Sequence, residues 1–329
     1  MNHRIALHRR RIVGAAVAVA LAAGGVTAAT GVPAAAAAGG VAREAAVPRP
    51  ASYVITEVAG SNPEGIEVTR TGTMYVTSVA TGEVFRGSTR DSQLRSWLPA
   101  GSDGRTAATG IHVDRWGRVL VAGAATGHFY VYSPDGELLA DRSVPGESFL
   151  NDFAFTKDAV YVTDSAKGAV YRASLSRSGI GRLEPFVEAA DFTPAPSFLN
   201  GIVSTAGGRY LLVVDWLTNI TYRVDVRTRE VRQVTVAGGQ ELGGDGALLQ
   251  GRMLRTVQTD WSTEQTFLRT ARFSGDYLTA TVVSDSARVG FDVSPTTVAR
   301  DRARYLWVGS QLNSDLQRPP YRVGVVPTR

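Results

Sequence analysis

The sequence contains no cysteine. Without thiols the chain can form neither a disulfide framework nor a thiolate-bound metal centre. Histidine is nearly as scarce, because only four are present and two of them lie within the first ten residues. The remaining two, His112 and His128, are too few for the zinc, copper or iron sites that proteins build from imidazole and thiolate. The composition therefore argues against a redox metalloenzyme.

A helical pattern is also lacking after residue 50. No window there combines apolar residues at helical spacing with capping residues at its ends. Val, Tyr, Phe and Thr dominate short runs instead, and Gly, Asp, Asn and Ser lie between the runs, which is the composition of strands and turns. The sequence predicts an all-β fold, and its length after residue 50 fits one large domain or two smaller ones.

A true excess of charge is missing as well. The formal net charge is +5, but four of the arginines lie within the first eleven residues. The rest of the chain is nearly neutral, which removes the electrostatic basis for binding nucleic acid or a membrane surface. We expect a monomer whose partner is a small-molecule substrate.

The N-terminal region has the pattern of a secretory signal peptide. Three arginines precede an apolar run from Ile12 to about Ala29, and an alanine tract then offers cleavage sites. A membrane anchor is the alternative, but the run is rich in Ala and Gly rather than Leu. We expect a signal peptide over 1–39, a disordered linker over 40–50 and one domain over 51–329. The mature protein would be secreted and leave no membrane segment behind.

An internal repeat organises the domain. The short segment that begins at Asn200 recurs along the chain, and most copies carry a polar residue at the position equivalent to Asn200. We call these six positions the register residues. They are Glu64, Thr109, Asn151, Asn200, Asp245 and Thr296, with spacings of 45, 42, 49, 45 and 51 residues. Each unit contains about four strand-like runs, which is typical of a β-propeller blade.

The repeat predicts a six-bladed β-propeller of four-stranded blades. The last unit has one strand too few, and the run from Ser52 to Val58 precedes the first blade. This N-terminal strand is expected to complete the last blade and close the ring, which leaves no exposed edge. A pair of β-sandwiches has similar strand counts but fits a single sustained period less well.

The register residues suggest a metal site. In a propeller the first strand of each blade lines the central channel, so equivalent positions converge on the axis. Glu64, Asn151, Asn200 and Asp245 then offer two carboxylates and two amide oxygens, a ligand set that suits Ca²⁺. Mg²⁺ or Mn²⁺ are the other candidate ions. The alternative is that these are ordinary turn residues that precede a strand.

The chain resembles the SMP-30/gluconolactonase/LRE-like group of six-bladed propellers. The resemblance covers about residues 52 to 326 and is carried by short phrases in register. These phrases are Pro63-Glu64-Gly65, Leu150-Asn151-Asp152, Leu199-Asn200-Gly201, Asp245-Gly246, Tyr161-Val162-Thr163-Asp164 and Val213-Val214-Asp215. The resemblance implies a divalent cation, commonly calcium, held by Glu64, Asn151, Asn200 and Asp245. It also implies hydrolysis of lactones or related esters, with Asp245 or a water that it holds as the general base.

Other residues have weaker assignments. We expect Thr109, Trp216 and Thr296 to contact substrate, although Trp216 could instead wedge between blades, as could Trp116. Thr109 stands where related propellers carry His or Asn, so neither a paraoxonase-type histidine pair nor sugar-lactone specificity is supported. Two further expectations concern side chains away from the site. His128 is expected at the surface, and Asp164 and Asp215 are expected to anchor turns.

His112 lies three residues after a register residue, so strand alternation is expected to point it away from the Thr109 side. Two functions from different classes remain. The first is a secreted, cation-dependent hydrolase, and the second is a non-catalytic extracellular propeller that binds a ligand or a protein with a structural cation. Propellers host both uses. A base beside an open metal face would distinguish them, and Asp245 is the candidate.

Overall fold

A computed structural model describes residues 49–327. The predicted signal peptide and residues 40–48 of the predicted linker lie outside this range. Arg49 and Pro50, the last two residues of that linker, lie against the final blade, where Arg49 pairs with Asp301 and the Pro50 carbonyl accepts a hydrogen bond from Arg304. No helix in the described part of the chain is long and apolar enough to cross a membrane.

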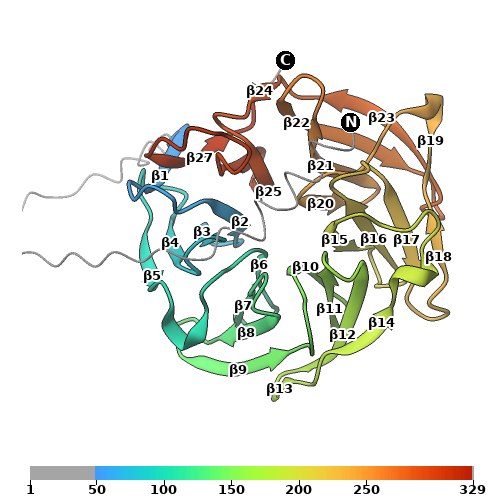
Figure 1. Ribbon diagram of the computed structural model, residues 1–329, viewed down its shortest axis with the longest axis horizontal. Coiled ribbons are helices and arrows are strands. Elements are labelled where there is room, and N and C mark those ends of the chain that lie inside the picture. The colour runs from blue at the N-terminus through green and yellow to red at the C-terminus, as the bar shows by residue number, and fades with distance from the viewer. Residues whose placement is uncertain (1–48, 328–329) are drawn as a thin grey trace, which may run out of the picture.

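Residues 49–327 form six sheets around a common axis, which confirms the predicted six-bladed propeller (Figure 1). Blades 1 and 2 each contain four strands. They are β2 (Pro63–Val68), β3 (Thr73–Ser78), β4 (Val84–Ser88) and β5 (Arg95–Leu98), then β6 (Ile111–Val113), β7 (Val119–Ala122), β8 (His128–Tyr132) and β9 (Leu138–Ser143).

Blades 3 and 4 follow the same antiparallel order. Their strands are β10 (Leu150–Phe155), β11 (Ala159–Asp164), β12 (Ala169–Ser176) and β14 (Glu184–Val187), then β15 (Leu199–Ser204), β16 (Tyr210–Asp215), β17 (Thr221–Asp225) and β18 (Val231–Gln233). A two-residue strand, β13 (Gly179–Ile180), extends β12 in blade 3.

Blade 5 is the largest sheet. Its four main strands are β20 (Ala247–Gln250), β21 (Met253–Asp260), β22 (Gln265–Phe273) and β23 (Thr279–Asp285). Two short strands extend it: β19 (Thr235–Val236) runs parallel to β23, and β24 (Val289–Gly290) pairs with β22. The repeat did not predict these additions.

Blade 6 closes the ring as predicted. It contains β25 (Pro295–Asp301), β26 (Arg304–Gly309) and β27 (Tyr321–Val325), and β1 (Ser52–Thr56) is its outermost strand. Because the two ends of the described chain pair in one sheet, the ring is held shut by main-chain hydrogen bonds rather than by packing alone.

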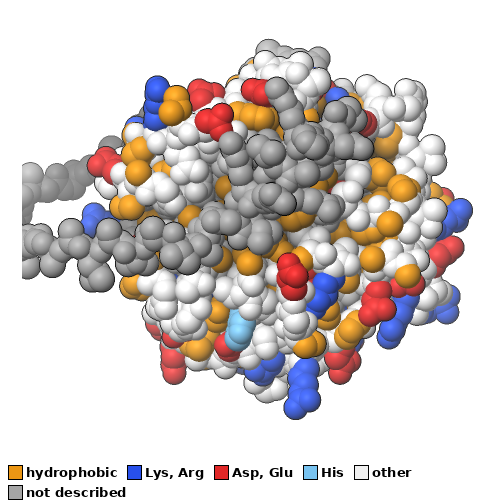
Figure 2. Space-filling view, in the orientation of Figure 1, with side chains coloured by type: hydrophobic (Ala, Val, Ile, Leu, Met, Phe, Trp, Pro, Cys, Tyr) orange, Lys and Arg blue, Asp and Glu red, His pale blue; other side chains and the backbone are white. Residues whose placement is uncertain are grey.

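Apolar residues fill the interfaces between neighbouring blades. One cluster lies between blades 4 and 5, for example, and contains Leu212, Leu254 and Phe273, all nearly inaccessible to solvent. A further cluster, centred on Trp216, gathers residues from the ends of several blades. On the face shown in Figure 2, acidic and basic side chains are interspersed around the rim. The hydrophobic effect at these interfaces therefore stabilises the ring, and polar residues can line the axis.

Candidate functional site at the channel mouth

Bulges set the direction of the register residues. In blades 1, 3, 4 and 6 the pairing between the first and second strands shifts register at the residues around Glu64, Asn151, Asn200 and Thr296. A bulge leaves one residue out of the ladder and re-aims its side chain. The irregularity therefore accounts for how these positions face the axis rather than a neighbouring blade.

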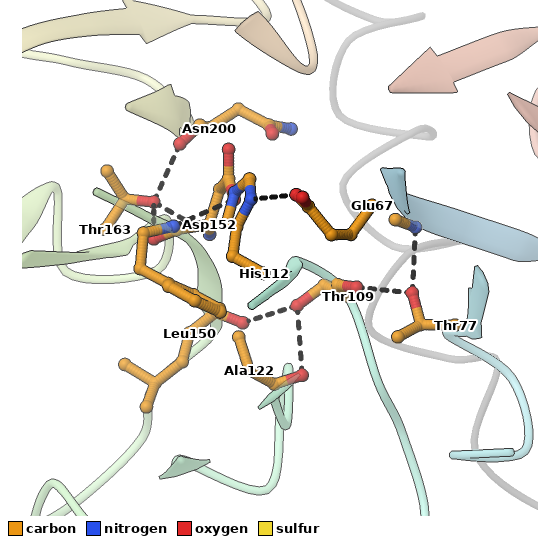
Figure 3. A network of polar contacts seen from close by, with 11 residues as sticks. Glu67, Thr77, Thr109, His112, Ala122, Leu150, Asp152, Thr163 and Asn200 are labelled. Atoms are coloured by element: carbon orange, nitrogen blue, oxygen red, sulfur yellow. Dashed lines mark hydrogen bonds and ion pairs between the residues drawn. The ribbon is translucent and has the colours of Figure 1, made fainter. Parts of the chain in front are cut away.

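A ring of hydrogen bonds ties the register residues together. The main-chain carbonyl of each one accepts a hydrogen bond from the preceding blade. The donors are the Thr296 hydroxyl to Glu64 (2.7 Å), the Thr77 hydroxyl to Thr109, the Gly110 N–H to Asn151 (2.7 Å), the Thr163 hydroxyl to Asn200 (2.7 Å), the Gly201 N–H to Asp245 (3.1 Å) and the Gly246 N–H to Thr296 (2.8 Å). Figure 3 shows the links at Thr109 and Asn200. Each of these carbonyls is thus tied to the neighbouring blade, which fixes the backbone from which the side chains extend.

Glycine next to a register residue permits this close approach. A Cβ at Gly201 would lie 2.7 Å from both the Asp245 carbonyl oxygen and the Ala247 nitrogen, and one at Gly110 would lie 2.6 Å from the Asn151 carbonyl oxygen. Real side chains do not tolerate such distances to backbone. The Asn-Gly phrase is therefore a packing requirement of the ring as well as a turn feature.

The four predicted cation ligands line one small cavity. Glu64, Asn151, Asn200 and Asp245 are all between 2% and 5% exposed. The cavity holds about 20 Å³ that a water-sized sphere can occupy, which is room for about one water molecule or one bare ion. The structure thus brings together residues that are up to 181 positions apart in the sequence.

Several oxygens in this cavity have no partner. Glu64 Oε2, Asn151 Oδ1 and Asp245 Oδ1 are buried and make no hydrogen bond within the described chain. Orphaned buried oxygens are unusual in folded proteins and cost free energy. All three orphans are acceptors, so the group that would satisfy them is a cation or a hydrogen-bond donor.

The carboxyl groups of the cavity have raised pKa values, which also favours a bound positive charge. Burial raises the pKa of Glu64 well above its usual value, and repulsion by Asp245 and Asp152 adds to this. Burial also raises the pKa of Asp245, an effect that a hydrogen bond from Asn200 opposes and repulsion by Asp152 reinforces. A positive charge in the cavity would relieve both effects.

This donor set fits a hard divalent cation. Among the described residues no group of three or more His, Cys, Asp and Glu side chains is placed to hold a metal ion. The candidate site has only two carboxylates, so Asn151 and Asn200 would have to supply the other oxygens. Carboxylate and amide oxygens are ligands that Ca²⁺ accepts, with water completing the shell.

An apolar collar surrounds the cavity. Phe149, Phe198 and Trp216 line it together with the register residues. The Phe198 ring lies 5.5 Å from Phe149 and 5.7 Å from Trp216, centroid to centroid, and the Trp216 Nε1–H donates to the Thr259 hydroxyl. The collar lowers the local polarity, which strengthens any electrostatic interaction at the mouth.

The two threonines expected to contact substrate have other partners. Thr109 lines the cavity, but its hydroxyl donates to the Leu150 carbonyl at 2.8 Å (Figure 3). Thr296 is not among the cavity-lining residues, and its hydroxyl donates to the Glu64 carbonyl. The structure therefore places Thr296 in the ring that supports Glu64.

A second polar cluster in the channel was missed by the sequence reasoning. His112 lies between two carboxylates, with Nδ1 2.9 Å from Glu67 Oε2 and Nε2 3.0 Å from Asp152 Oδ1 (Figure 3). Burial lowers the pKa of His112, but the two carboxylates outweigh it and raise the pKa to about 10. Since Glu67 and His112 both lie three residues after a register residue, their shared position in the repeat could have revealed the pair.

The remaining sequence expectations concern residues away from the mouth. Asp164 and Asp215 anchor turns as expected, because each accepts several main-chain N–H bonds. The His128 side chain is 40% exposed and pairs with Asp141. Trp116 packs against the cluster between blades 2 and 3.

Comparisons with known proteins identify the fold but no sequence family. No family model matches the sequence, and neither does any curated protein. The resemblance to the SMP-30/gluconolactonase/LRE-like group is therefore supported only in its fold, a six-bladed β-propeller.

Three solved structures illustrate the likeness. A streptogramin B lyase matches with a TM-score of 0.56 at 9% identity, over 83% of this chain and 96% of that chain. Virginiamycin B lyase from Staphylococcus aureus matches with a TM-score of 0.53 at 13% identity, over 84% and 98%. The major allergen Mala s 1 of Malassezia sympodialis matches with a TM-score of 0.59 at 12% identity, over 84% and 96%. At these identities the likeness concerns the fold alone.

Proposed function

We propose that the chain is a divalent-cation-dependent hydrolase of lactones or related esters, with its site at the channel mouth. One observation carries this proposal. Two buried carboxylates and two amide side chains from four different blades converge on a cavity of about one ion's size, and three of their oxygens have no partner in the described part of the chain. The lyases among the structural neighbours show that propellers of this shape can host enzymes, which supports the proposal only by analogy.

Each group at the mouth would have its own role. Glu64, Asn151, Asn200 and Asp245 would hold the cation. When bound, a cation of this kind supplies a Lewis acid for a substrate carbonyl. Asp245, or a water that it holds, would accept a proton from the attacking water. Phe149 and Phe198 would exclude bulk water from the reacting group.

The size of the cavity favours a second candidate function. A space of about 20 Å³ accommodates an ion but not an organic substrate. If the substrate carbonyl cannot reach the ion from outside, the cation is structural and the protein is a non-catalytic binding module. In both cases the N-terminal pattern supports export to the outside of the cell, and the mixed surface charge does not favour nucleic acid as a partner.

Hydrolysis assays distinguish the two functions. The protein lacking residues 1–39 would be incubated with a panel of lactones and aryl esters, with EDTA and after restoration of Ca²⁺, Mg²⁺ or Mn²⁺. We expect turnover that EDTA abolishes and one of these ions restores. Asp245→Ala should lower turnover by about 100-fold or more, as expected for loss of a general base, and Asn200→Ala should weaken the response to the ion.

Asp135→Ala is the matched control, because Asp135 is an exposed turn residue in blade 2. It should leave turnover unchanged. Turnover that survives both Asp245→Ala and Asn200→Ala would contradict the channel-mouth mechanism. A cation-dependent rise in melting temperature without any hydrolysis would establish the binding module instead.

A further inference from the structure

A large cleft lies beside the mouth, between blades 4 and 5. Its volume is about 840 Å³, within the range of sites for small organic ligands. Turns at one end of the two blades line it, one over 217–219 between β16 and β17 and another over 260–264 between β21 and β22. Its position follows from the enlarged sheet of blade 5, and the register residues are not part of it.

The cleft and the mouth share a wall of two indoles. Trp216 lines the mouth and Trp261 lines the cleft, and their ring centroids are 5.1 Å apart. On its other side Trp261 lies 5.9 Å from Phe291. Trp261 and Phe291 are partly exposed, so a flat apolar ring can contact both.

Two buried amide oxygens in the cleft lack hydrogen-bond donors within the described chain. Gln258 is 3% exposed and Asn219 is 7% exposed, and neither Gln258 Oε1 nor Asn219 Oδ1 has a partner within the described chain. The Asn219 amide N–H groups are already used, at 3.0 Å by Glu241 Oε2 and at 3.4 Å by the Thr259 carbonyl. Both residues line the cleft, so a ligand that donates hydrogen bonds there would satisfy these oxygens.

The charges of the cleft favour a cation over an anion. Its two arginines are already paired, Arg269 with Asp285 at 2.8 Å and Arg288 with Asp260 at 2.8 Å. The Glu241 carboxylate, in contrast, forms no ion pair in the part of the chain that the structure describes and accepts a hydrogen bond from the neutral Asn219 amide, while the main-chain carbonyl of Glu241 accepts one from Arg269. An anionic ligand would therefore find no available guanidinium, whereas an ammonium group would find a carboxylate and two carbonyl acceptors.

We propose that this cleft binds an amine attached to an aromatic ring, with the ring against Trp261 and Phe291 and the ammonium against Glu241, Asn219 and Gln258. A cation of this kind also interacts favourably with the faces of the aromatic side chains. The cleft would hold the amine-bearing part of a substrate whose ester or lactone group reaches the mouth past Trp261. This last step rests on the proposed function.

Binding experiments test the cleft separately from catalysis. The protein lacking residues 1–39 would be titrated, with EDTA present, against 2-phenylethylamine, 3-phenylpropionate and butylamine, by calorimetry or by saturation-transfer NMR. These probes separate the contribution of the charge from that of the ring. We expect 2-phenylethylamine to bind at least about tenfold more tightly than the other two, a difference of about 1.4 kcal/mol. Equal or tighter binding of 3-phenylpropionate, or no binding of the amine by folded protein, would overturn the proposal.

Two variants locate the site. Glu241→Gln should weaken binding of 2-phenylethylamine by about tenfold, and the exposed Glu137→Gln in blade 2 should not change it. Gln258→Leu should also weaken binding while leaving the melting temperature the same or higher, because it removes an unpaired buried oxygen. Unchanged binding in both Glu241→Gln and Gln258→Leu would show that the amine binds elsewhere.

The assay also separates the two proposals. If the amine binds in the cleft but no ester is hydrolysed, the binding site stands and the proposed hydrolase is wrong. If hydrolysis occurs but esters that carry an arylalkylamine have the same KM as esters that lack it, the placement of the substrate in the cleft is wrong.

Discussion

Two acidic clusters share the central channel, and they differ in one respect. At the mouth, Glu64 and Asp245 are buried without a positively charged partner among residues 49–327, and an oxygen of each is orphaned there. We call Glu67, His112 and Asp152 the inner cluster. In it the two carboxylates flank His112, and each ring nitrogen lies within 3.0 Å of a carboxylate oxygen. A carboxylate only accepts hydrogen bonds, so the imidazole must carry both protons.

The two clusters differ in the source of their positive charge. The inner cluster contains its own cation and is complete without a ligand. The mouth has a similar excess of acid but no such cation within residues 49–327, although its carboxylates are more deeply buried than Glu67 and Asp152. The proposed cation at the mouth would give the orphaned oxygens the partner that His112 gives to the inner cluster.

The largest effect is expected from breaking the mouth without touching the inner cluster. Gly201→Ala places a Cβ 2.7 Å from two backbone atoms of blade 5. We expect it to lower the free energy of unfolding by about 2–3 kcal/mol, as overpacking does, and to displace Asp245. Denaturant unfolding measures the loss. Gly179→Ala is the control, because no atom lies within 4 Å of its added Cβ, and equal losses in both variants would show that the ring does not need glycine.

Glu64 and Glu67 lie three residues apart on β2 and offer a matched pair. Ca²⁺ added at 100 times its Kd should raise the free energy of unfolding of the wild-type protein by about 2.7 kcal/mol. Glu64→Gln should abolish this stabilisation. It should not lower stability in EDTA, because the lost charge had no partner. Glu67→Gln should lower stability in EDTA and keep the response to Ca²⁺. Thermal unfolding with and without Ca²⁺ measures the stability of both variants. If Ca²⁺ and EDTA change the stability of the two variants equally, the two clusters do not differ as described.

Removing His112 should leave the inner cluster with unpaired carboxylates, as at the mouth. His112→Ala leaves two facing carboxylates unpaired, and we expect a loss of about 2 kcal/mol in the free energy of unfolding, between the values for exposed and buried pairs. His128→Ala is the control, since its pair with Asp141 is exposed, and it should cost less than about 0.5 kcal/mol. If His112→Ala lowers the free energy of unfolding no more than the control does, the inner cluster does not stabilise the fold.

Asp301 provides a paired carboxylate outside the channel. Burial raises its pKa, but hydrogen bonds from Arg49 and Arg304 outweigh this and lower the pKa below its usual value. A carboxyl group with a lowered pKa stabilises the fold above its unfolded pKa, and this stabilisation is lost as the pH falls through the folded pKa. Asp301→Asn should thus cost about 1 kcal/mol at pH 7 and less as the pH falls below about 4. Unfolding at pH 7 and pH 3 measures the difference, and a cost that does not shrink in acid would contradict the ion-pair assignment.

The repeat was enough to predict the blades, the closing strand and the convergence of Glu64, Asn151, Asn200 and Asp245. These features depend on one period that every blade obeys. The role of Thr296 could not be predicted, because its hydroxyl meets the Glu64 carbonyl only after the ring has closed.

The inner cluster and the cleft depend on what differs between blades. Asp152 reaches His112 because a bulge in β10 shifts the register beside it, and a periodic pattern does not show a bulge. The cleft beside Trp261 depends on the lengthened strands β21 and β22, which break the common blade length. Such local departures are decided by tertiary packing and not by the repeat.

The central claim is that the mouth binds one divalent cation through side-chain oxygens. Tb³⁺ shares the preference of Ca²⁺ for oxygen ligands, and its luminescence is sensitised by a tryptophan as close as Trp216 is to this cavity. Tryptophan-excited Tb³⁺ emission should saturate at one ion per chain, fall when Ca²⁺ is added, and be absent in Asp245→Ala. Emission that is absent from the wild-type protein, or that persists unchanged in Asp245→Ala, would contradict the account.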